Sequence, residues 1–173
     1  MFYAGIGSRE TPQFYLNQMI DIGRICGKKG LVLRSGGAIG ADQAFEKGCD
    51  MEKGHKIIWK ATWGERIKEE EWAKELASTV CWEYPLKDMK SSTRNLIIRN
   101  MYQIFGERNT TPVDFCIYYN LDDPMIKGSK GGTRYAVRVA KQSNIPCFNL
   151  RTEQREFAEF FKAYFEKPHN SIW

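Results

Sequence analysis

The sequence predicts an α/β domain in which a Rossmann-like parallel sheet is covered by helices on both faces. Short apolar runs alternate with longer segments in which apolar residues recur at helical spacing. Glycine-rich turns follow several of the apolar runs. Parallel neighbouring strands need long crossover connections, and helices supply them, so this alternation favours a parallel sheet.

The first expected strand runs from Phe2 to Ile6, and Thr11 and Pro12 after it suit the N-cap and the first residue of a helix. That helix ends in a glycine-lysine segment, where glycine favours termination. The further elements expected in the first half are a strand at 31–33, a helix at 40–48, a strand at 56–59 and a charged, solvent-facing helix at 65–78.

The second half of the chain contains the clearest buried strand, at 115–119, which is rich in aromatic residues. A helix at 91–105 precedes it, and the loop at 120–130 after it is a candidate lid. The remaining expected elements are a helix at 132–142, a strand at 145–149 and an amphipathic C-terminal helix. We expect one domain over residues 1–173, with a core at 2–150 and the C-terminal helix within 152–166.

Composition narrows the possible partners. The formal net charge is +5, but positive and negative residues are interspersed, which indicates a mild preference for anionic ligands rather than a nucleic-acid signature. The sequence has no apolar run of about 18 residues and does not begin like a signal peptide, so we expect a cytoplasmic protein with no membrane partner.

The cysteines and histidines give no sign of a metal or a disulfide framework. The 5 cysteines are odd in number, scattered and never spaced as C-x-x-C. Neither His55 nor His169 has partners at metal-ligand spacing. We therefore expect no metal site and no resident cofactor, and the sequence shows no Ser-His-Asp or G-x-S-x-G pattern for nucleophilic catalysis.

Three glycine-rich segments, GIGSR, SGGAIGAD and KGGTR, each follow an expected strand. Glycine lets the backbone approach a phosphate closely, and the N-terminus of a following helix offers free amides. Hydroxyl groups and cations in these segments add donors. Because such ligands bind beyond the carboxyl ends of parallel strands, we expect a nucleotide or similar phosphorylated ligand there. The expected contact residues are Gly7, Ser8, Arg9, Ser35, Gly36, Gly37, Gly40, Lys130, Gly131, Gly132, Thr133 and Arg134.

Two polar features have alternative interpretations. Asp42, in the first turn of its helix, either favours the helix dipole or accepts hydrogen bonds from a ribose hydroxyl. In RNLIIRN, Asn95 and Arg99 lie four residues apart on one helical face, beside Arg94. That face is either solvated or forms a polar wall of the pocket.

Four segments, GIGSRETP, LRSGGAIGADQAFEKG, RNLIIRN and KGGTRYAVRVAKQSNIPCFNL, resemble in this order the SLOG superfamily. This Rossmann-like group includes DprA-like DNA-processing proteins, LOG-type nucleotide phosphoribohydrolases and molybdenum-cofactor carrier proteins. The resemblance covers residues 2–150. It implies a Rossmann-like sheet and a nucleotide or nucleotide derivative held by Gly36, Gly37, Gly131, Gly132 and Thr133.

LOG-type enzymes cleave the N-glycosidic bond of a nucleoside monophosphate with an arginine-lysine pair and a glutamate after the glycine turn. Here Arg99 matches the arginine, but Asn100 replaces the lysine and no acid follows Thr133 closely. A glycosidase needs a group that stabilises an oxocarbenium-like transition state. The acidic residues that could substitute are Asp42, Glu46 and Asp114, so an enzyme would have Arg99, Asp42 and Glu46 as its catalytic candidates.

Three functions remain open. The first is a nucleotide-binding protein that senses, carries or sequesters its ligand, and the second is a nucleotide N-glycosidase. The third is a DprA-like binder of single-stranded DNA, which would use Arg9, Lys130, Arg134 and Arg138 along a groove. The missing glutamate favours the first over the second, and the low net charge argues against the third. Members of the superfamily are often homodimers, and the aromatic C-terminal helix either forms such an interface or caps the core.

Overall fold

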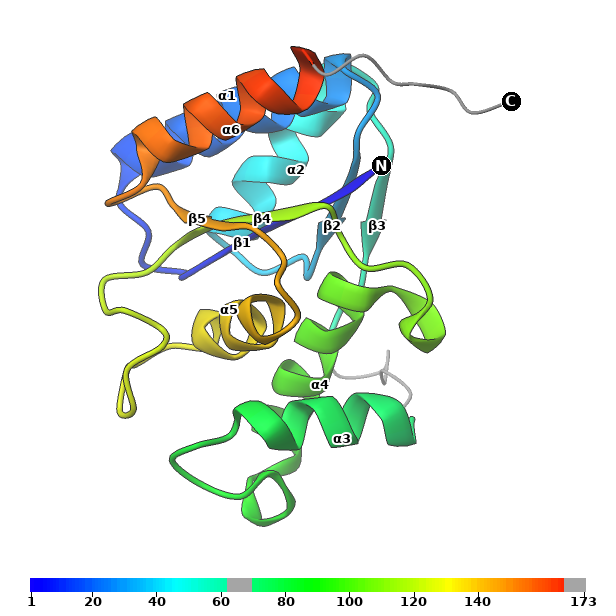
Figure 1. Cartoon of the computed structure of the whole chain (residues 1–173), viewed down its shortest axis with the longest axis vertical. Helices are drawn as coiled ribbons and strands as arrows, with labels where there is room; N and C mark the ends of the chain where they lie inside the picture. The colour runs from blue at the N-terminus through cyan, green and yellow to red at the C-terminus, as the bar shows by residue number, and fades with distance from the viewer. Residues whose placement is uncertain (62–69, 167–173) are drawn as a thin grey trace.

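The computed structural model describes residues 1–61 and 70–166. Five parallel strands form one sheet in the order β3-β2-β1-β4-β5, with β1 at the centre (Figure 1). The expected Rossmann-like α/β class is therefore confirmed. The strands are β1 (Phe2–Gly7), β2 (Val32–Ser35), β3 (Lys56–Ile58), β4 (Phe115–Tyr119) and β5 (Cys147–Asn149).

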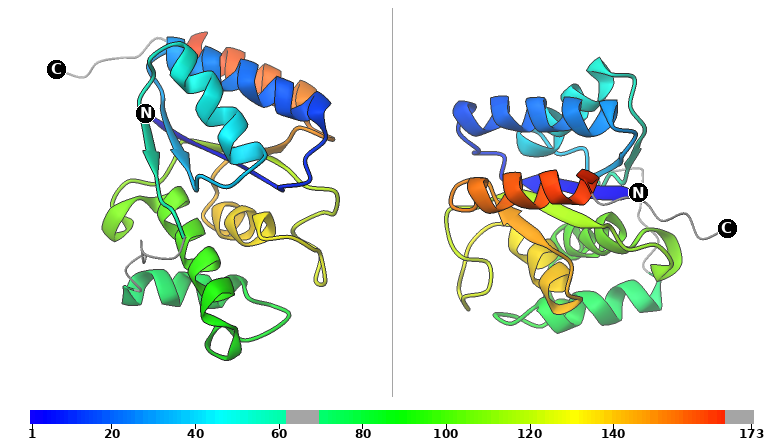
Figure 2. Two further views of the ribbon diagram at one scale, coloured as in Figure 1. Left: turned by 180° about the vertical axis from the view of Figure 1, so that it is seen from behind. Right: turned by 45° about the horizontal axis from the view of Figure 1, so that its top comes forward.

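Helices cover both faces of the sheet. One face carries α1 (Gln13–Lys28), α2 (Ala41–Met51) and α6 (Gln154–Glu166), and α6 runs alongside α1 (Figure 2). The other face carries α4 (Ser91–Phe105) and α5 (Thr133–Gln142). Outside these two lies α3 (Glu71–Val80) as a further layer. None of the helices within the described ranges has the length and apolar character needed to cross a bilayer.

Alternation along the strands divides the core into two clusters. Tyr3 and Phe115 face α1, α2 and α6, whereas Ala4 and Cys116, one position later, face α3, α4 and α5. Around the ring of Phe115 gather aromatic side chains of α6, which supports the capping role of that helix over the interface role. These are Phe157, Phe160, Phe161 and Tyr164.

Two elements differ from their expected form. Thr11 does not cap α1, because Pro12 occupies the cap position; the Thr11 hydroxyl instead donates to the carbonyl of Ser8 over 2.7 Å and tightens the turn after β1. The helix expected at 65–78 begins at Glu71 and ends at Val80, and residues 62–69 lie outside the described part. It is not simply solvent-facing, since one side of α3 is buried against α4 and α5.

Glycines allow α1 and α2 to pack backbone against backbone. A Cβ atom on Gly48 would lie 2.0 Å from the carbonyl oxygen of Ile20, and one on Gly23 would lie 2.4 Å from that of Phe45. Both distances are below any real Cβ contact. The approach of these helices therefore requires glycine at both positions.

We predict that Gly48→Ala lowers the free energy of unfolding by about 1–3 kcal/mol, because the methyl group forces the helices apart. An unhindered glycine in a helix interior would instead gain about 0.5–1 kcal/mol from the same change. Urea denaturation followed by circular dichroism measures the difference. Gly132→Ala is the control, because a Cβ there meets nothing within 4 Å; equal stabilities of the two variants would contradict the packing argument.

Candidate functional site

A pocket of 590 Å³ lies beyond the carboxyl end of β1, between α4 and the start of α5. The chain leaves β1 for β2 on one side and returns to β4 on the other, so this is the point where the strand order reverses. Ligands of open α/β sheets bind at such a point, and pockets for small molecules have about 300–1,000 Å³. The predicted site residues that line it are Gly7, Ser8, Arg9, Arg99, Gly131, Gly132, Thr133 and Arg134.

The N-terminus of α5 forms one wall of this pocket. Gly132 occupies the cap position, and no side chain caps the helix. The first-turn residues Thr133 and Arg134 line the pocket, as does Gly131, whose φ of +85° is one that favours glycine. The start of α5 therefore presents backbone donors and the positive end of a helix dipole to the pocket.

The loop after β1 forms a second wall. A Cβ on Gly7 would lie 2.4 Å from the Cβ of Ala41, so glycine is required for the strand to turn under α2. Ser8 accepts a hydrogen bond from the amide of Glu10 over 3.1 Å. The exposed side chains of Arg9 and Glu10 stand at the pocket, and sequence reasoning had not singled out Glu10.

Arg99 lies beneath the pocket and joins two loops. Its Nη1 donates to the carbonyl of Gly36 over 3.0 Å and lies 3.8 Å from a carboxylate oxygen of Asp42. Its Nη2 donates to Asn100 over 3.2 Å, and Asn100 donates to the carbonyl of Gly132 over 3.0 Å. Burial lowers the pKa of Arg99, and the charge of Asp42 opposes that shift.

The third nitrogen of the Arg99 guanidinium is different. Nε is buried and has no hydrogen-bond partner among the described residues. The side chain is 10% exposed, and the residue lines the pocket. A buried guanidinium N–H without a partner is costly, so the other contacts of Arg99 must offset this cost.

Asp42 and Glu46 of α2 accept hydrogen bonds from the loop after β2 and hold it in place. Asp42 is 1% exposed and accepts the amides of Gly36 and Ala38 over 3.1 and 3.4 Å. Ser35 donates to Glu46 over 2.5 Å. Burial raises the pKa of Asp42 to about 6, although Arg99 and the two amides lower it. Both carboxylates thus support the loop. Asp42 lies in the first turn of α2, as the dipole interpretation requires, and its burial outside the pocket lining argues against contact with a ribose.

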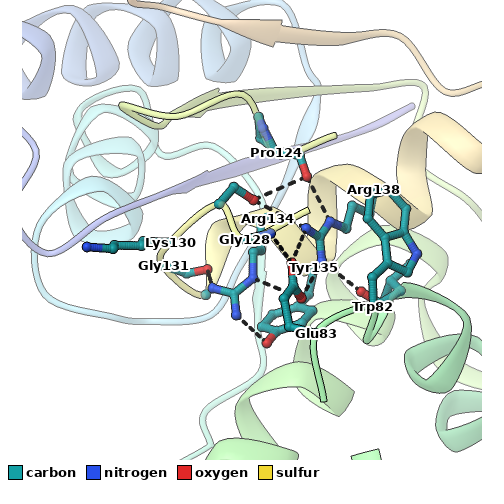
Figure 3. Close-up of polar contacts among 12 residues, drawn as sticks. Trp82, Glu83, Pro124, Gly128, Lys130, Gly131, Arg134, Tyr135 and Arg138 are labelled. Carbon is teal, nitrogen blue, oxygen red and sulfur yellow. Dashed lines mark hydrogen bonds and ion pairs between the residues drawn. The ribbon is translucent and has the colours of Figure 1, made fainter. Parts of the chain in front are cut away.

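Several predicted site residues lie away from the pocket lining. Ala38 brings the loop after β2 to the pocket, whereas the glycines and the serine of this loop are not among the lining residues. Lys130 is exposed, and its side chain extends away from the cluster around Arg138 (Figure 3). The residues outside the lining are Ser35, Gly36, Gly37, Gly40, Asp42, Glu46, Arg94, Asn95 and Lys130.

The face that α4 turns to the pocket was missed in part. Thr93, Leu96 and Asn100 line the pocket together with Arg99. Their spacing of three and four residues places them on one side of the helix. Helical spacing measured from Leu96 gives Thr93, Arg99 and Asn100, whereas the spacing of four between Asn95 and Arg99 indicates a neighbouring side of the helix.

The prediction that Arg138 lines an exposed groove is wrong, because the residue is 0% exposed. Its guanidinium donates to the carbonyl of Pro124 over 2.7 Å and to both oxygens of Glu83 over 2.6 and 2.9 Å, and it stacks on Trp82 (Figure 3). Hydrogen bonds from Arg138 to Pro124, Ile126 and Ser129 therefore fix the loop at 120–130 to α5. This anchoring argues against its expected role as a lid.

Comparisons with known proteins give one informative result. No family model matches the sequence, and no curated protein shows significant similarity. This chain is similar to a solved structure of DNA processing protein A from Helicobacter pylori, with a TM-score of 0.54 and 19% identity. That structure was determined to describe how DNA processing protein A binds single-stranded DNA. The match covers 86% of this chain and 64% of that chain, so this chain spans less than two thirds of its neighbour. At this identity the likeness shows the fold.

Metal binding gains no support from the geometry. Within the described ranges, no three histidine, cysteine, aspartate or glutamate side chains converge as metal ligands would. The polar groups at the pocket are mostly donors, namely amides, hydroxyls and guanidinium groups. Such a set suits an anion.

We predict that Asp42 makes stability fall as the pH rises between about 4 and 6. The pKa of Asp42 is raised from 3.8 to about 6 by burial, so in this window the folded state holds a proton that the unfolded state has lost. Ionisation therefore costs the folded state stability as the pH rises. Asp42→Asn removes this contribution.

Urea denaturation of both proteins at pH 4, 5, 6 and 7 (about the window of this shift) provides the measurement. The stability of Asp42→Asn relative to the parent protein should increase across the series. The ionisation of Glu83, whose pKa is lowered to about 2 by hydrogen bonds from Arg138, is common to both proteins and cancels in the comparison. Parallel pH profiles would refute the assignment.

Proposed function

We propose that this protein binds a nucleotide or a related phosphorylated ligand, with a phosphate at the N-terminus of α5, and that it senses, carries or sequesters that ligand. The observation that carries the proposal is the meeting of two positive groups at one pocket. These are the uncapped start of α5 and the guanidinium group of Arg99.

The phosphate end of the ligand lies where these groups converge. Helix N-termini bind phosphate through first-turn amides and the helix dipole, as at Thr133 and Arg134. Arg99 contributes a charge-assisted donor, and its remaining nitrogens are already engaged. Asn100 accepts a hydrogen bond from Arg99 and donates one to the carbonyl of Gly132. It therefore fixes the distance between Arg99 and the N-terminus of α5.

The rest of the ligand lies along α4. Thr93 and Asn100 both line the pocket, and seven residues of helix extend about 10 Å. That length accommodates a sugar and a base beyond the phosphate. Leu96 and Ala38 provide apolar surface there, and Leu96 is 37% exposed. Contact of a base with such surface favours affinity without strong selection among bases.

Binding without hydrolysis is the better supported form of this proposal. A nucleotide N-glycosidase needs a carboxylate near the glycosidic bond. Asp42 and Glu46 are engaged in holding the loop after β2, and Glu10 is the carboxylate among the described lining residues. If free base is released from a nucleoside monophosphate, Glu10→Gln should abolish that release.

Single-stranded DNA is the second candidate, favoured by the similarity to DNA processing protein A. In this case the pocket would hold one phosphate of a strand, and the exposed side chains of Arg9 and Lys130 would contact its neighbours. The two candidates differ in their dependence on salt. Each phosphate neutralised on a single strand contributes about −0.7 to the slope of log K against log salt.

We predict a salt slope shallower than about −2 for a labelled oligonucleotide, the value for roughly three phosphate contacts. Fluorescence anisotropy at several sodium chloride concentrations measures it. The physical reason is that Arg138, which would have extended the groove, is buried. A steep slope with submicromolar affinity would make DNA the preferred ligand.

We predict that Gly132→Leu abolishes nucleotide binding and leaves the fold intact. Gly132 has φ −69° and ψ −25°, which any residue adopts, and its Cβ would point into open space at the pocket. A leucine side chain there blocks the approach of a phosphate to the helix start. Isothermal titration calorimetry with nucleoside mono-, di- and triphosphates gives the affinities, and thermal unfolding tests the fold.

Gly132→Ala should give an intermediate loss of affinity, because a single methyl group fills less of the same space. Lys47→Leu, at an exposed position of α2, is the control for adding an apolar side chain elsewhere. Nucleotide affinity that is unchanged in Gly132→Leu would show that the ligand binds at another place.

A further inference from the structure

Two arginines of α5 share one carboxylate, which comes from a distant part of the chain. Glu83, in the segment between α3 and α4, receives two hydrogen bonds from Arg138. The same carboxylate lies 3.8 Å from Nε of Arg134 (Figure 3). The cluster therefore carries two positive charges and one negative charge.

Arg138 is the buried partner of this cluster. Every nitrogen of its guanidinium donates to a described oxygen, in the segments at 80–83 and 124–129. With Arg138 at 0% exposure, Glu83 compensates a charge that water cannot reach. Glu83 is consequently committed first to Arg138, and the remaining positive charge belongs to Arg134.

Arg134 holds that surplus charge at the edge of the pocket. Its Nη1 donates to the carbonyl of Gly131 over 2.6 Å, and its Nη2 donates to the hydroxyl of Tyr135. Its Nε is buried and has no hydrogen-bond partner within the described part of the chain, although Glu83 attracts it. The guanidinium is thus drawn against the pocket wall by Glu83 and bends back over its own glycine turn.

Glu83 also fixes the loop that leads into this turn. Its Oε1 accepts the amide of Gly128 over 3.0 Å. Arg138, oriented by Glu83, donates to the carbonyl of Ile126 and to the hydroxyl of Ser129. The carboxylate therefore restrains both the residues before Gly131 and the arginine after it.

We propose that Glu83 is a positioning residue of the anion site: it sets the location of Arg134 at the Gly131–Gly132 turn against which a phosphate binds. This inference rests on the proposed function. Glu83 does not line the pocket and acts through Arg134, so its effect on binding depends on the presence of Arg134.

A double-mutant cycle tests this dependence. Isothermal titration calorimetry with adenosine 5′-monophosphate and with adenosine compares the parent protein, Glu83→Gln, Arg134→Ala and the double variant. Arg134→Ala should weaken binding of the monophosphate by about tenfold or more, the value of one charge-assisted hydrogen bond, and leave adenosine binding unchanged. Glu83→Gln should weaken the monophosphate alone, and the double variant should bind it no more weakly than Arg134→Ala.

Several outcomes would overturn the proposal. Glu83→Gln that binds the monophosphate like the parent protein would do so, and so would a loss that adds in full to that of Arg134→Ala. The latter result indicates general damage to the structure. An equal loss for adenosine and its monophosphate has the same meaning. Glu159→Gln, which breaks an exposed ion pair of α6 with Arg155, is the matched control and should bind normally.

Glu83→Gln leaves Arg138 buried without its counter-ion, so the variant could fail to fold. Glu83→Gln/Arg138→Met removes both members of the buried pair and retains Arg134. This protein should be the more stable one and should show the same selective loss for the monophosphate; binding like the parent protein would overturn the proposal. If the parent protein binds none of the adenosine mono-, di- and triphosphates, the proposed function fails and this inference fails with it. Binding by the parent protein that does not change in the Glu83 variants overturns this inference alone.

Discussion

The arrangement of the pocket depends on the buried guanidinium of Arg99. It holds the carbonyl of Gly36 at the end of β2, is paired with Asp42 at the start of α2, and reaches the start of α5 through Asn100. A Cβ on Gly36 would lie 2.0 Å from Nη1, so this contact also explains the glycine. One side chain of α4 therefore sets the separation of the loops that surround the pocket.

Burying a charged group is costly unless it is paired and hydrogen-bonded. Among the described residues, two buried arginines are paired with a carboxylate: Arg99 with Asp42 and Arg138 with Glu83. In each case the carboxylate is used to hold a loop and is not turned toward the pocket. These two carboxylates are thus occupied by structural contacts, and Glu10 is the acidic residue among the described lining residues.

The strand at 115–119 and the helix at 91–105 could be predicted to the residue, because both carry strong local patterns. The glycine turns after β1 and before α5 were also predictable, since helix starts that follow strands recur in this class of fold. The role of Asp42 was not, because its partners are backbone amides whose orientation no residue pattern shows. Glu83 and Arg138 are separated by 55 positions, and no local spacing indicates their pairing.

The net charge of the sequence did not indicate the positive pocket, because the position of individual arginines depends on contacts between distant residues. A formal charge of +5 over 173 residues gives no expectation of a focused positive site. At the pocket, however, Arg99 and Arg134 each keep a buried Nε without a hydrogen-bond partner among the described residues, while their other nitrogens are held by oxygens. Two donors fixed in a low-dielectric environment attract an anion more strongly than exposed lysines do, because water screens them less. The positive character of this pocket therefore depends on how a few guanidinium groups are held, and the total charge of the chain contributes little to it.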